Sequence, residues 1–177
     1  MLDIAVGHQL GIITYLLGEF ATVSATTTRH YSTATLIDAE RKPTSKVVPV
    51  TAPDQIAFTG LFKSGVISSI IWRGGFKSTP GRKQFIWEID GEEGSIRLEG
   101  DALASAYIHI SQPKVYLNGE LVEVPETAGP GDNLAAAWEE YAKGDKGNYP
   151  TMEYAVMIHH VLDAITRSAE EGKTIQL

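Results

Sequence analysis

Two side chains near the start of the sequence are of the types that transfer protons in enzymes. Asp3 and His8 interrupt an otherwise apolar run, Leu-Asp-Ile-Ala-Val-Gly-His-Gln-Leu-Gly, at positions 2–11. An imidazole changes its charge near neutral pH, and a neighbouring carboxylate favours one of its tautomers, so the pair suits general acid/base chemistry. We therefore take Asp3 and His8 as the candidate catalytic residues.

Each of these two residues also has a structural interpretation. His8 fits a helix histidine bonded to a backbone carbonyl, and Asp3 fits a capping carboxylate near the positive end of a helix dipole. On a regular helix five residues correspond to about 140° of rotation, so Asp3 and His8 would point apart unless the helix begins near Gly7. The sequence leaves both interpretations open.

A second set of residues suits ligand binding. Trp72 and Arg73 adjoin at the end of a strand-like segment; an indole offers a face for stacking, and a guanidinium binds a carboxylate or a sugar hydroxyl. The alternative for this pair is a sheet surface or an interface. Tyr154 lies on the predicted last helix, where it either packs or lines a cleft. We take Trp72, Arg73 and Tyr154 as candidate substrate-binding residues.

The helices that must hold these residues follow from the apolar pattern. Apolar residues recur every three to four positions from Leu2 to Leu17, which predicts a helix that ends at Gly18. Two more helices are predicted over 132–144 and 150–172. In the last one, the predicted core-facing stripe consists of Met152, Ala155, Val156, His159, Leu162 and Ile165.

The centre of the sequence predicts antiparallel strands. Strand-like segments lie at 21–31, 54–62, 65–74, 83–90, 94–100, 106–112 and 114–124, with a short closing strand at 173–177. Tight reversals are predicted at 63–65, 91–94 and 118–119. Residues 31–53 hold three prolines and predict an excursion with little regular structure. The order of elements indicates an α+β fold with a large open, mainly antiparallel sheet and helices packed on one face.

The composition is that of a soluble globular chain and excludes several classes of partner. With 177 residues, 43% of them hydrophobic, we expect a single domain over 1–177. The net charge is −7 and the basic residues form no block, which argues against nucleic acid. No apolar run approaches the ~18 residues of a membrane span, and no signal peptide pattern is present, so we expect no membrane contact. The sequence has no cysteine, which fits a cytoplasmic location.

The motifs of several self-contained enzymes are absent from the sequence. It has no G-x-G-x-x-G opening a βαβ unit, no phosphate-binding G-x-x-x-x-G-K-[ST], no H-E-x-x-H and no G-x-S-x-G. His159 and His160 are adjacent, so on a helix they point about 100° apart and cannot bind one ion together. We therefore expect neither a metal site nor a complete dinucleotide-binding domain.

Several segments, taken in order, resemble a known family. They are LDIAVGHQL at 2–10, YLLGEF at 15–20, APDQIAFTG at 52–60, GVISSII at 65–71, WEIDGEEGSIRLEG at 87–100 and YPTMEYAVMIHHVLDAITRSAEEGKTIQL at 149–177. Together they resemble the C-terminal domain of the Gfo/Idh/MocA oxidoreductases. They are most similar to the fungal branch that includes the repressor of the galactose regulon. The resemblance covers nearly the whole chain.

The resemblance implies a two-domain architecture. In the family, an N-terminal Rossmann half binds NAD(P) and supplies a lysine, while the α+β half supplies the substrate pocket and a dimer surface on its open sheet. The chain resembles the second half only, which implies no cofactor in this chain, and NAD(P) only if a partner or a preceding segment supplies a Rossmann domain. The implied partners are a second copy bound through the open sheet, a Rossmann-domain protein and a small-molecule ligand.

The family's catalytic pattern is matched in part. Active members carry Asp-x-x-x-His on the first helix, and His8 matches the histidine. Ile4 stands at the position of the aspartate, with Asp3 one residue earlier. A second acidic residue, often found three positions after the histidine, is replaced by Gly11.

Three functions follow from the residues and the resemblance. The first is the substrate domain of a truncated or split NAD(P)-dependent sugar- or polyol-type dehydrogenase. The second is a non-catalytic regulatory or interaction module of the galactose-repressor type, whose open sheet carries self-association or an acidic activation segment. The third is a cofactor-free isomerase or cyclase with His8 as general acid/base.

Overall fold

The computed structural model describes residues 2–75, 80–101, 112–124 and 130–177. The chain divides into two compact units, each described by itself below. The first holds Met1–Phe76 and Met152–Leu177, and the second holds Lys77–Thr151. That the chain forms one domain over 1–177 stays a prediction.

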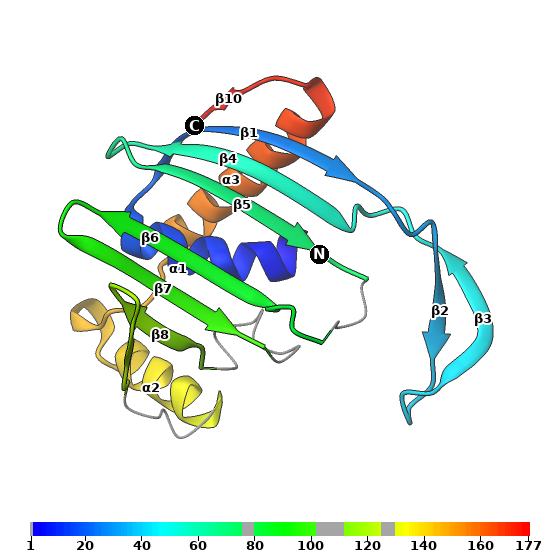
Figure 1. The fold of residues 1–177 in the computed structure, drawn as a ribbon, viewed down its shortest axis with the longest axis horizontal. Coiled ribbons are helices and arrows are strands. Elements are labelled where there is room, and N and C mark those ends of the chain that lie inside the picture. Colours follow the sequence, from blue (N-terminus) through cyan, green and yellow to red (C-terminus); the bar gives the residue numbers. More distant parts are fainter. Residues whose placement is uncertain (1, 76–79, 102–111, 125–129) are drawn as a thin grey trace. The chain divides into compact units, whose positions relative to one another are not determined.

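The first unit is built on a four-stranded antiparallel sheet with helices on one face (Figure 1). Its strands are β1 (Phe20–Thr28), β4 (Gln55–Phe62), β5 (Ile67–Arg73) and β10 (Ile175–Gln176), in the spatial order β10-β1-β4-β5. Its helical segments are η1 (Leu2–Val6), α1 (Gly7–Leu17) and α3 (Met152–Glu171). Helix α3 packs on β1 and β10, and α1 packs on α3.

Strands β4 and β5 form the hairpin that the alternating pattern predicts. In β4 every second residue is buried, so one face of the strand carries Ile56, Phe58 and Phe62 towards the helices. The Phe62 backbone N–H donates to the Val66 carbonyl at 2.8 Å, and Gly65 turns the chain with a φ of 90°. This left-handed conformation favours glycine, and the predicted turn at 63–65 is confirmed.

The core of the first unit depends on a glycine in β4. The Phe20 ring stacks on Phe62 with centroids 4.1 Å apart, and it meets Phe58 edge-on. A Cβ atom at Gly60 would lie 2.3 Å from the Phe20 ring. Because no real Cβ approaches another atom so closely, the aromatic cluster requires glycine at this position.

Helix α3 is buried only in its C-terminal half. Leu162 and Ile165 are buried as predicted, and the Ser168 hydroxyl accepts the Ala25 N–H at 2.8 Å and donates to the Lys173 carbonyl at 2.7 Å. In the N-terminal half, however, Met152 and Val156 are 76% and 50% exposed. The predicted core-facing stripe is therefore wrong in this half, because α3 there borders a pocket instead of packing on the sheet.

The excursion between β1 and β4 is more regular than the sequence indicated. It contains the antiparallel strands β2 (Thr33–Ile37) and β3 (Pro43–Pro49), which pair only with each other. The expectation of little regular structure over 31–53 is wrong. Two of the three prolines stand at the ends of β3, where a strand tolerates the missing N–H.

The second unit holds another four-stranded antiparallel sheet and a helix. The strands are β6 (Phe85–Gly91), β7 (Gly94–Gly100), β8 (Lys114–Leu117) and β9 (Glu120–Val122), followed by α2 (Pro130–Ala142) and the short 3₁₀ helix η3 (Gly144–Lys146). The predicted reversals at 91–94 and 118–119 are confirmed, the latter with positive φ at Asn118 and Gly119. The predicted strand at 106–112, with His109, lies outside the described residues.

The α+β class with antiparallel sheets is confirmed. The strands are distributed over two four-stranded sheets and the two-stranded ribbon β2–β3. All the strand pairs of the described ranges are antiparallel, so these ranges contain no βαβ unit, the unit on which dinucleotide-binding folds are built.

Candidate functional site

The candidate catalytic residues lie on a helical segment that begins with a wide turn. Residues Leu2–Val6 form the π-helical turn η1, and the α-helix begins at Gly7. A π turn closes between residues i and i+5, so each residue advances the helix by a smaller angle than in an α-helix. The turn therefore narrows the angle of about 140° that would separate Asp3 from His8 on a regular helix.

Helix α1 keeps its apolar side on α3 and exposes the side that carries His8. Leu10, Ile13 and Thr14 are buried. His8 and Tyr15 are seven residues apart, hence on one stripe of the helix, and both are exposed. Asp3 is also exposed. The structure thus places both candidate catalytic side chains on the surface of the first unit.

Tyr154 joins α3 to the candidate catalytic helix. Its hydroxyl donates to the Gly11 carbonyl and lies 2.7 Å from the Thr14 hydroxyl. Gly11 follows His8 by three residues, so Tyr154 lies within one helical turn of His8. Among the described residues, no atom outside the local helix backbone lies within 4 Å of a Cβ built at Gly11, so the space beside this position, between His8 and Tyr15, is open with respect to them.

Trp72 and Arg73 lie at the end of β5 on opposite faces of the sheet. Trp72 is half-buried opposite Ile56, on the inner face, whereas Arg73 is exposed opposite Gln55. Adjacent strand residues point to opposite faces, so the two side chains do not approach one ligand from the same side. The structure brings Tyr154 to the candidate catalytic helix, while Trp72 and Arg73 lie on a separate element. A substrate-binding role for each stays a prediction.

The Asp54 carboxylate binds the backbone just after β1, where the chain leaves the sheet near the end of β5 that carries Trp72. Asp54 accepts the backbone N–H groups of His30, at 2.9 Å, and Tyr31, at 2.7 Å, and also the side-chain amide of Gln55. Burial raises the pKa of Asp54, but these hydrogen bonds outweigh it, so the pKa lies below its usual value. His30 takes part in this cluster through its backbone N–H, and its imidazole meets the Tyr31 ring edge-on at 4.9 Å.

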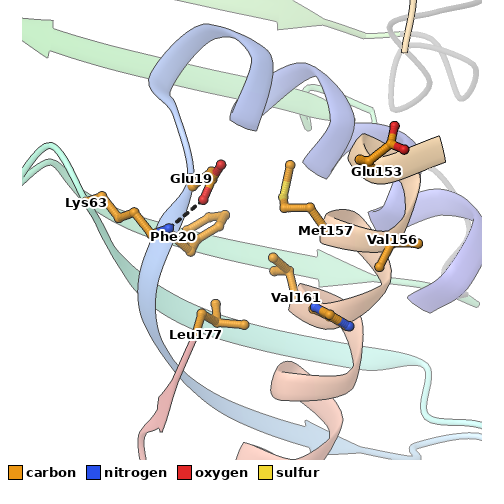
Figure 2. Close-up of a pocket in the computed structure, with 9 residues that line it drawn as sticks. Glu19, Phe20, Lys63, Glu153, Val156, Met157, Val161 and Leu177 are labelled. Atoms are coloured by element: carbon orange, nitrogen blue, oxygen red, sulfur yellow. Dashed lines mark hydrogen bonds and ion pairs between the residues drawn. The ribbon is translucent and has the colours of Figure 1, made fainter. Parts of the chain in front are cut away.

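A pocket of about 350 Å³ lies in the first unit beside the exposed half of α3 (Figure 2). Its apolar lining comes from Phe20, Val156, Met157, Val161 and Leu177. Its polar lining comes from Glu19, Lys63, Glu153 and His160. Lys63 and Glu19 form an ion pair of 2.6 Å on one side, with Glu153 on the other, as Figure 2 shows. We call these nine residues the α3 groove.

No sequence pattern predicts the α3 groove. Its residues come from the start of β1, the β4–β5 turn, α3 and the end of the chain, which are far apart in the sequence. The exposed Met152 and Val156 belong to an apolar stripe that a sequence pattern cannot distinguish from core. The groove becomes apparent only in the folded structure, where the N-terminal half of α3 is exposed and borders it.

In the second unit, the buried carboxylate of Glu99 forms ion pairs with two basic side chains on one face of the sheet. Glu99 is 7% exposed and forms ion pairs with Lys83 at 3.0 Å and Arg97 at 2.9 Å. The Tyr116 hydroxyl donates to it at 3.2 Å. The hydrogen bond from Lys83 is the largest influence that lowers the pKa of Glu99. Every charge in this cluster is partnered, which fits a role in holding β6–β8 together.

Across residues 2–75, 80–101, 112–124 and 130–177 no group of three or more acidic or histidine side chains is placed to hold a metal ion. In the same ranges, none of the helices combines the length and apolarity needed to cross a bilayer.

The chain matches a family model and curated relatives. Residues 1–100 match the model of the Gal80p C-terminal domain. The dehydrogenase aclE of Aspergillus oryzae is 29% identical over 98% of this chain and 47% of its own length. The galactose/lactose metabolism regulatory protein GAL80 of Kluyveromyces lactis is 28% identical over 64% of this chain and 24% of its own length. The chain therefore spans less than half the length of these relatives.

Solved structures share the fold at low sequence identity. The super-repressor mutant of Gal80p from Saccharomyces cerevisiae superposes with a TM-score of 0.81 at 23% identity, over 99% of this chain and 49% of that one. A levoglucosan dehydrogenase in complex with NADH and L-sorbose gives a TM-score of 0.69 at 21% identity, over 98% of this chain and 49% of that one. Regulators and oxidoreductases thus share this fold, as the sequence resemblance implied. Since the family model covers more than half of the residues, the chain belongs to the family of the Gal80p C-terminal domain.

Proposed function

We propose that this chain is the substrate-facing half of an NAD(P)-dependent dehydrogenase that acts on a sugar or polyol. The observation that carries the proposal is the π turn η1. A π turn accommodates one more residue than an α turn, and this supports a placement of the Asp3 carboxylate and the His8 imidazole towards one face of the first helix. The name of one relative, a dehydrogenase, supports the reaction class, and a structural neighbour, a levoglucosan dehydrogenase in complex with NADH and L-sorbose, supports a sugar as the substrate.

In this proposal His8 handles the proton of a substrate hydroxyl. A neutral imidazole accepts that proton when the alcohol is oxidised and returns it when the carbonyl is reduced, and Asp3 favours the tautomer that can do so. The open space beside Gly11 leaves room for the ligand beside His8. Tyr154 holds α1 on α3 through its hydrogen bonds to the Gly11 carbonyl and the Thr14 hydroxyl.

The described residues do not form a site for the nicotinamide dinucleotide. Their sheets are antiparallel, and the sequence has no glycine-rich phosphate-binding turn. The hydride acceptor would therefore come with a nucleotide-binding fold from outside these residues. Within the proposal, the work of this chain is restricted to substrate binding and the hydroxyl proton. The absence of cysteine supports a reducing compartment, such as the cytoplasm, for this work.

The proposal is tested by following the His8 imidazole during sugar titrations. The chain is titrated with aldoses, polyols and L-sorbose while the carbon-bound imidazole protons are recorded by NMR. We expect at least one sugar to shift the His8 signals, and His8→Gln to weaken that binding at least tenfold. His159→Gln, which changes an exposed histidine on α3, is the matched control and should bind like the wild type. Sugars that shift no His8 signal, or a His8→Gln variant that binds normally, would contradict the proposal.

A second candidate function is a regulatory module that assembles through its sheet. The outer face of the first unit's sheet exposes Leu61, Ile67 and Ile71, and the last two are 79% and 70% exposed. An apolar face of this kind fits a homodimer, and the regulatory relatives support such a use. Replacing Ile67 and Ile71 by Lys should then abolish the dimer in sedimentation equilibrium, whereas His8→Gln should leave it unchanged. A dimer that survives both Lys substitutions would remove this candidate.

A further inference from the structure

The ribbon β2–β3 contains a bulge with an exposed serine at its centre. The pairing of the two strands shifts between Thr35 and Ile37, so that Leu36 alone faces residues 44–46 of β3. Ser45 is the middle residue of this bulge, and it is exposed. A bulge leaves its extra residues unpaired in the ladder, and the chain is therefore locally less constrained at this serine.

The Thr44 side chain holds the bulge in place, whereas that of Ser45 does not. The Thr44 hydroxyl donates to the Leu36 carbonyl at 2.9 Å and accepts the Lys46 N–H at 3.2 Å, in place of hydrogen bonds that the ladder loses there. The Ser45 hydroxyl makes no hydrogen bond within the described ranges. Of the two neighbouring hydroxyls, that of Ser45 is therefore the accessible one.

Basic side chains flank Ser45 on both sides. Arg41 and Lys42 precede it by four and three residues, and Lys46 follows it directly. All three are exposed, and none forms an ion pair in the part of the chain that the structure describes. Kinases select their substrates by such charge patterns, and free cations fit a kinase whose substrate groove is acidic. We propose that Ser45 is a phosphorylation site for a basophilic serine kinase. Thr44 follows the same basic residues, but its hydroxyl is already engaged in the bulge.

The segment around Ser45 can enter a kinase cleft at little cost in free energy. The only partner of β3 in the described sheets is β2, and no residue from Thr33 to Ile37 or from Pro43 to Pro49 is buried. An isolated two-stranded ribbon is marginally stable in water, so its local opening is inexpensive. The hydrogen bonds from the backbone just after β1 to Asp54 hold the base of the ribbon, so this opening need not spread into the main sheet.

Two other serines with charged neighbours lack this combination. Ser32 also follows an arginine by three residues, but Arg29 donates to the Val50 carbonyl at 2.9 Å and is not free to meet a kinase. Ser168 is followed by two acidic residues, a pattern that suits kinases with a basic groove. Ser168 is only 1% exposed, however, and its hydroxyl forms two hydrogen bonds. Only the serine of the bulge unites an exposed, unbonded hydroxyl with unpaired basic neighbours in this comparison.

The reaction uses ATP as the phosphoryl donor and the kinase as the catalyst. The Ser45 oxygen forms a bond to the γ-phosphorus of ATP while the bond from that phosphorus to the β–γ bridging oxygen breaks. ADP leaves, and the hydroxyl proton passes to the catalytic aspartate of the kinase. Residues 33–49 contain three basic and two acidic side chains, a net charge of +1. A phosphate adds about −1.5 to −2 at pH 7, so the ribbon changes from weakly basic to weakly acidic.

Phosphorylation of the full chain in vitro tests the proposal. The chain is incubated with Mg²⁺, ATP and one of two purified basophilic kinases, of the cyclic-AMP-dependent and the calcium- and phospholipid-dependent classes. The phosphorylated residue is then identified by tandem mass spectrometry. We expect at least one of these kinases to phosphorylate Ser45. Ser45→Ala should abolish this labelling, whereas Thr44→Ala, the matched control, should still be labelled at Ser45.

A second pair of variants tests the role of the basic residues. Lys42→Gln removes the cation three positions before Ser45 and should lower the kcat/KM of the kinase for this chain at least tenfold. Lys146→Gln removes an exposed lysine of η3 and should leave kcat/KM unchanged. Phosphate found chiefly on Thr44, no phosphate at Ser45 with either kinase, or a Lys42→Gln variant labelled like the wild type would overturn the proposal. Sugar binding at His8 is measured separately, so the two proposals fail independently.

Discussion

The π turn η1 can be tested by deleting one isoleucine. Deletion of Ile4 leaves Asp-Ala-Val-Gly-His, in which the aspartate and the histidine are four positions apart. On a regular α-helix these two side chains lie about 40° apart. Ile4 is 68% exposed, so its removal takes little apolar surface out of the core. We therefore expect the free energy of unfolding to change by no more than about 0.5 kcal/mol, as for other surface changes.

Deletion of Ile12 is the matched control, because it removes an isoleucine from the regular part of α1. All residues before it then rotate by about 100° relative to the rest of α1. The rotation takes Val6 and Leu10, 1% and 0% exposed, away from α3. Full burial of a valine or leucine side chain contributes about 1.5–3 kcal/mol, so the loss of both should cost about 3–6 kcal/mol.

The two deletions are compared by urea unfolding followed by tryptophan fluorescence. The Ile4 deletion should also keep the sugar-induced shifts of the His8 signals, because Asp3 stays on the His8 side of the helix. If this deletion destabilises the protein as much as the Ile12 deletion, the π turn is a requirement of the fold and does not accommodate an inserted residue. If it is stable but loses the His8 shifts, Asp3 and His8 do not act together.

Three further predictions concern packing and charge. Gly60→Ala should destabilise the protein by about 1–3 kcal/mol in urea unfolding, because the added Cβ overlaps the Phe20 ring. Phe20→Leu in the Gly60→Ala background should recover part of this loss of stability. If the losses of the two single variants simply add in the double variant, the contact is not the cause. Tyr154→Phe should cost about 0.5–1.5 kcal/mol through the lost hydrogen bond to the Gly11 carbonyl, whereas Tyr141→Phe, at an exposed position on α2, should cost nothing measurable. Because the pKa of Glu99 is lowered in the folded state, its stabilising effect is present above the ordinary value of 4.5 and is lost as the pH falls through the folded-state pKa. The stability difference between wild type and Glu99→Gln should therefore shrink on acidification; a difference that is the same at pH 7 and pH 3 would contradict this.

The sequence predicts well those features that depend on local pattern. The alternation in β4, the glycine after Lys63-Ser64 and the Asn118-Gly119 turn each determine a hairpin through neighbouring residues alone. The ribbon β2–β3 was missed because its prolines and polar residues indicate a loop, although prolines at strand ends do not prevent pairing. Periodicity identifies the apolar stripe of α3 but does not tell how far the sheet extends beneath it.

The candidate site was predictable only where it depends on residue types and not on tertiary packing. His8 and Asp3 stand out by residue type. The relative direction of their side chains depends on η1, however, and a sequence pattern read with a period of 3.6 residues does not predict a π turn. The hydrogen bonds of Tyr154 join residues more than 140 positions apart. The α3 groove likewise exists only after distant segments have met. Such features follow from tertiary packing and not from local sequence.

The open space beside Gly11 has a consequence for how stability and binding are related at this position. A glycine inside a helix costs about 0.5–1 kcal/mol relative to alanine. Among the described residues, no atom outside the local helix backbone lies within 4 Å of a Cβ built there, so an alanine fits. Gly11→Ala should therefore stabilise the helix, and within the proposed function it should also narrow the space that a ligand enters. Stability and ligand binding would then change in opposite directions at this one residue.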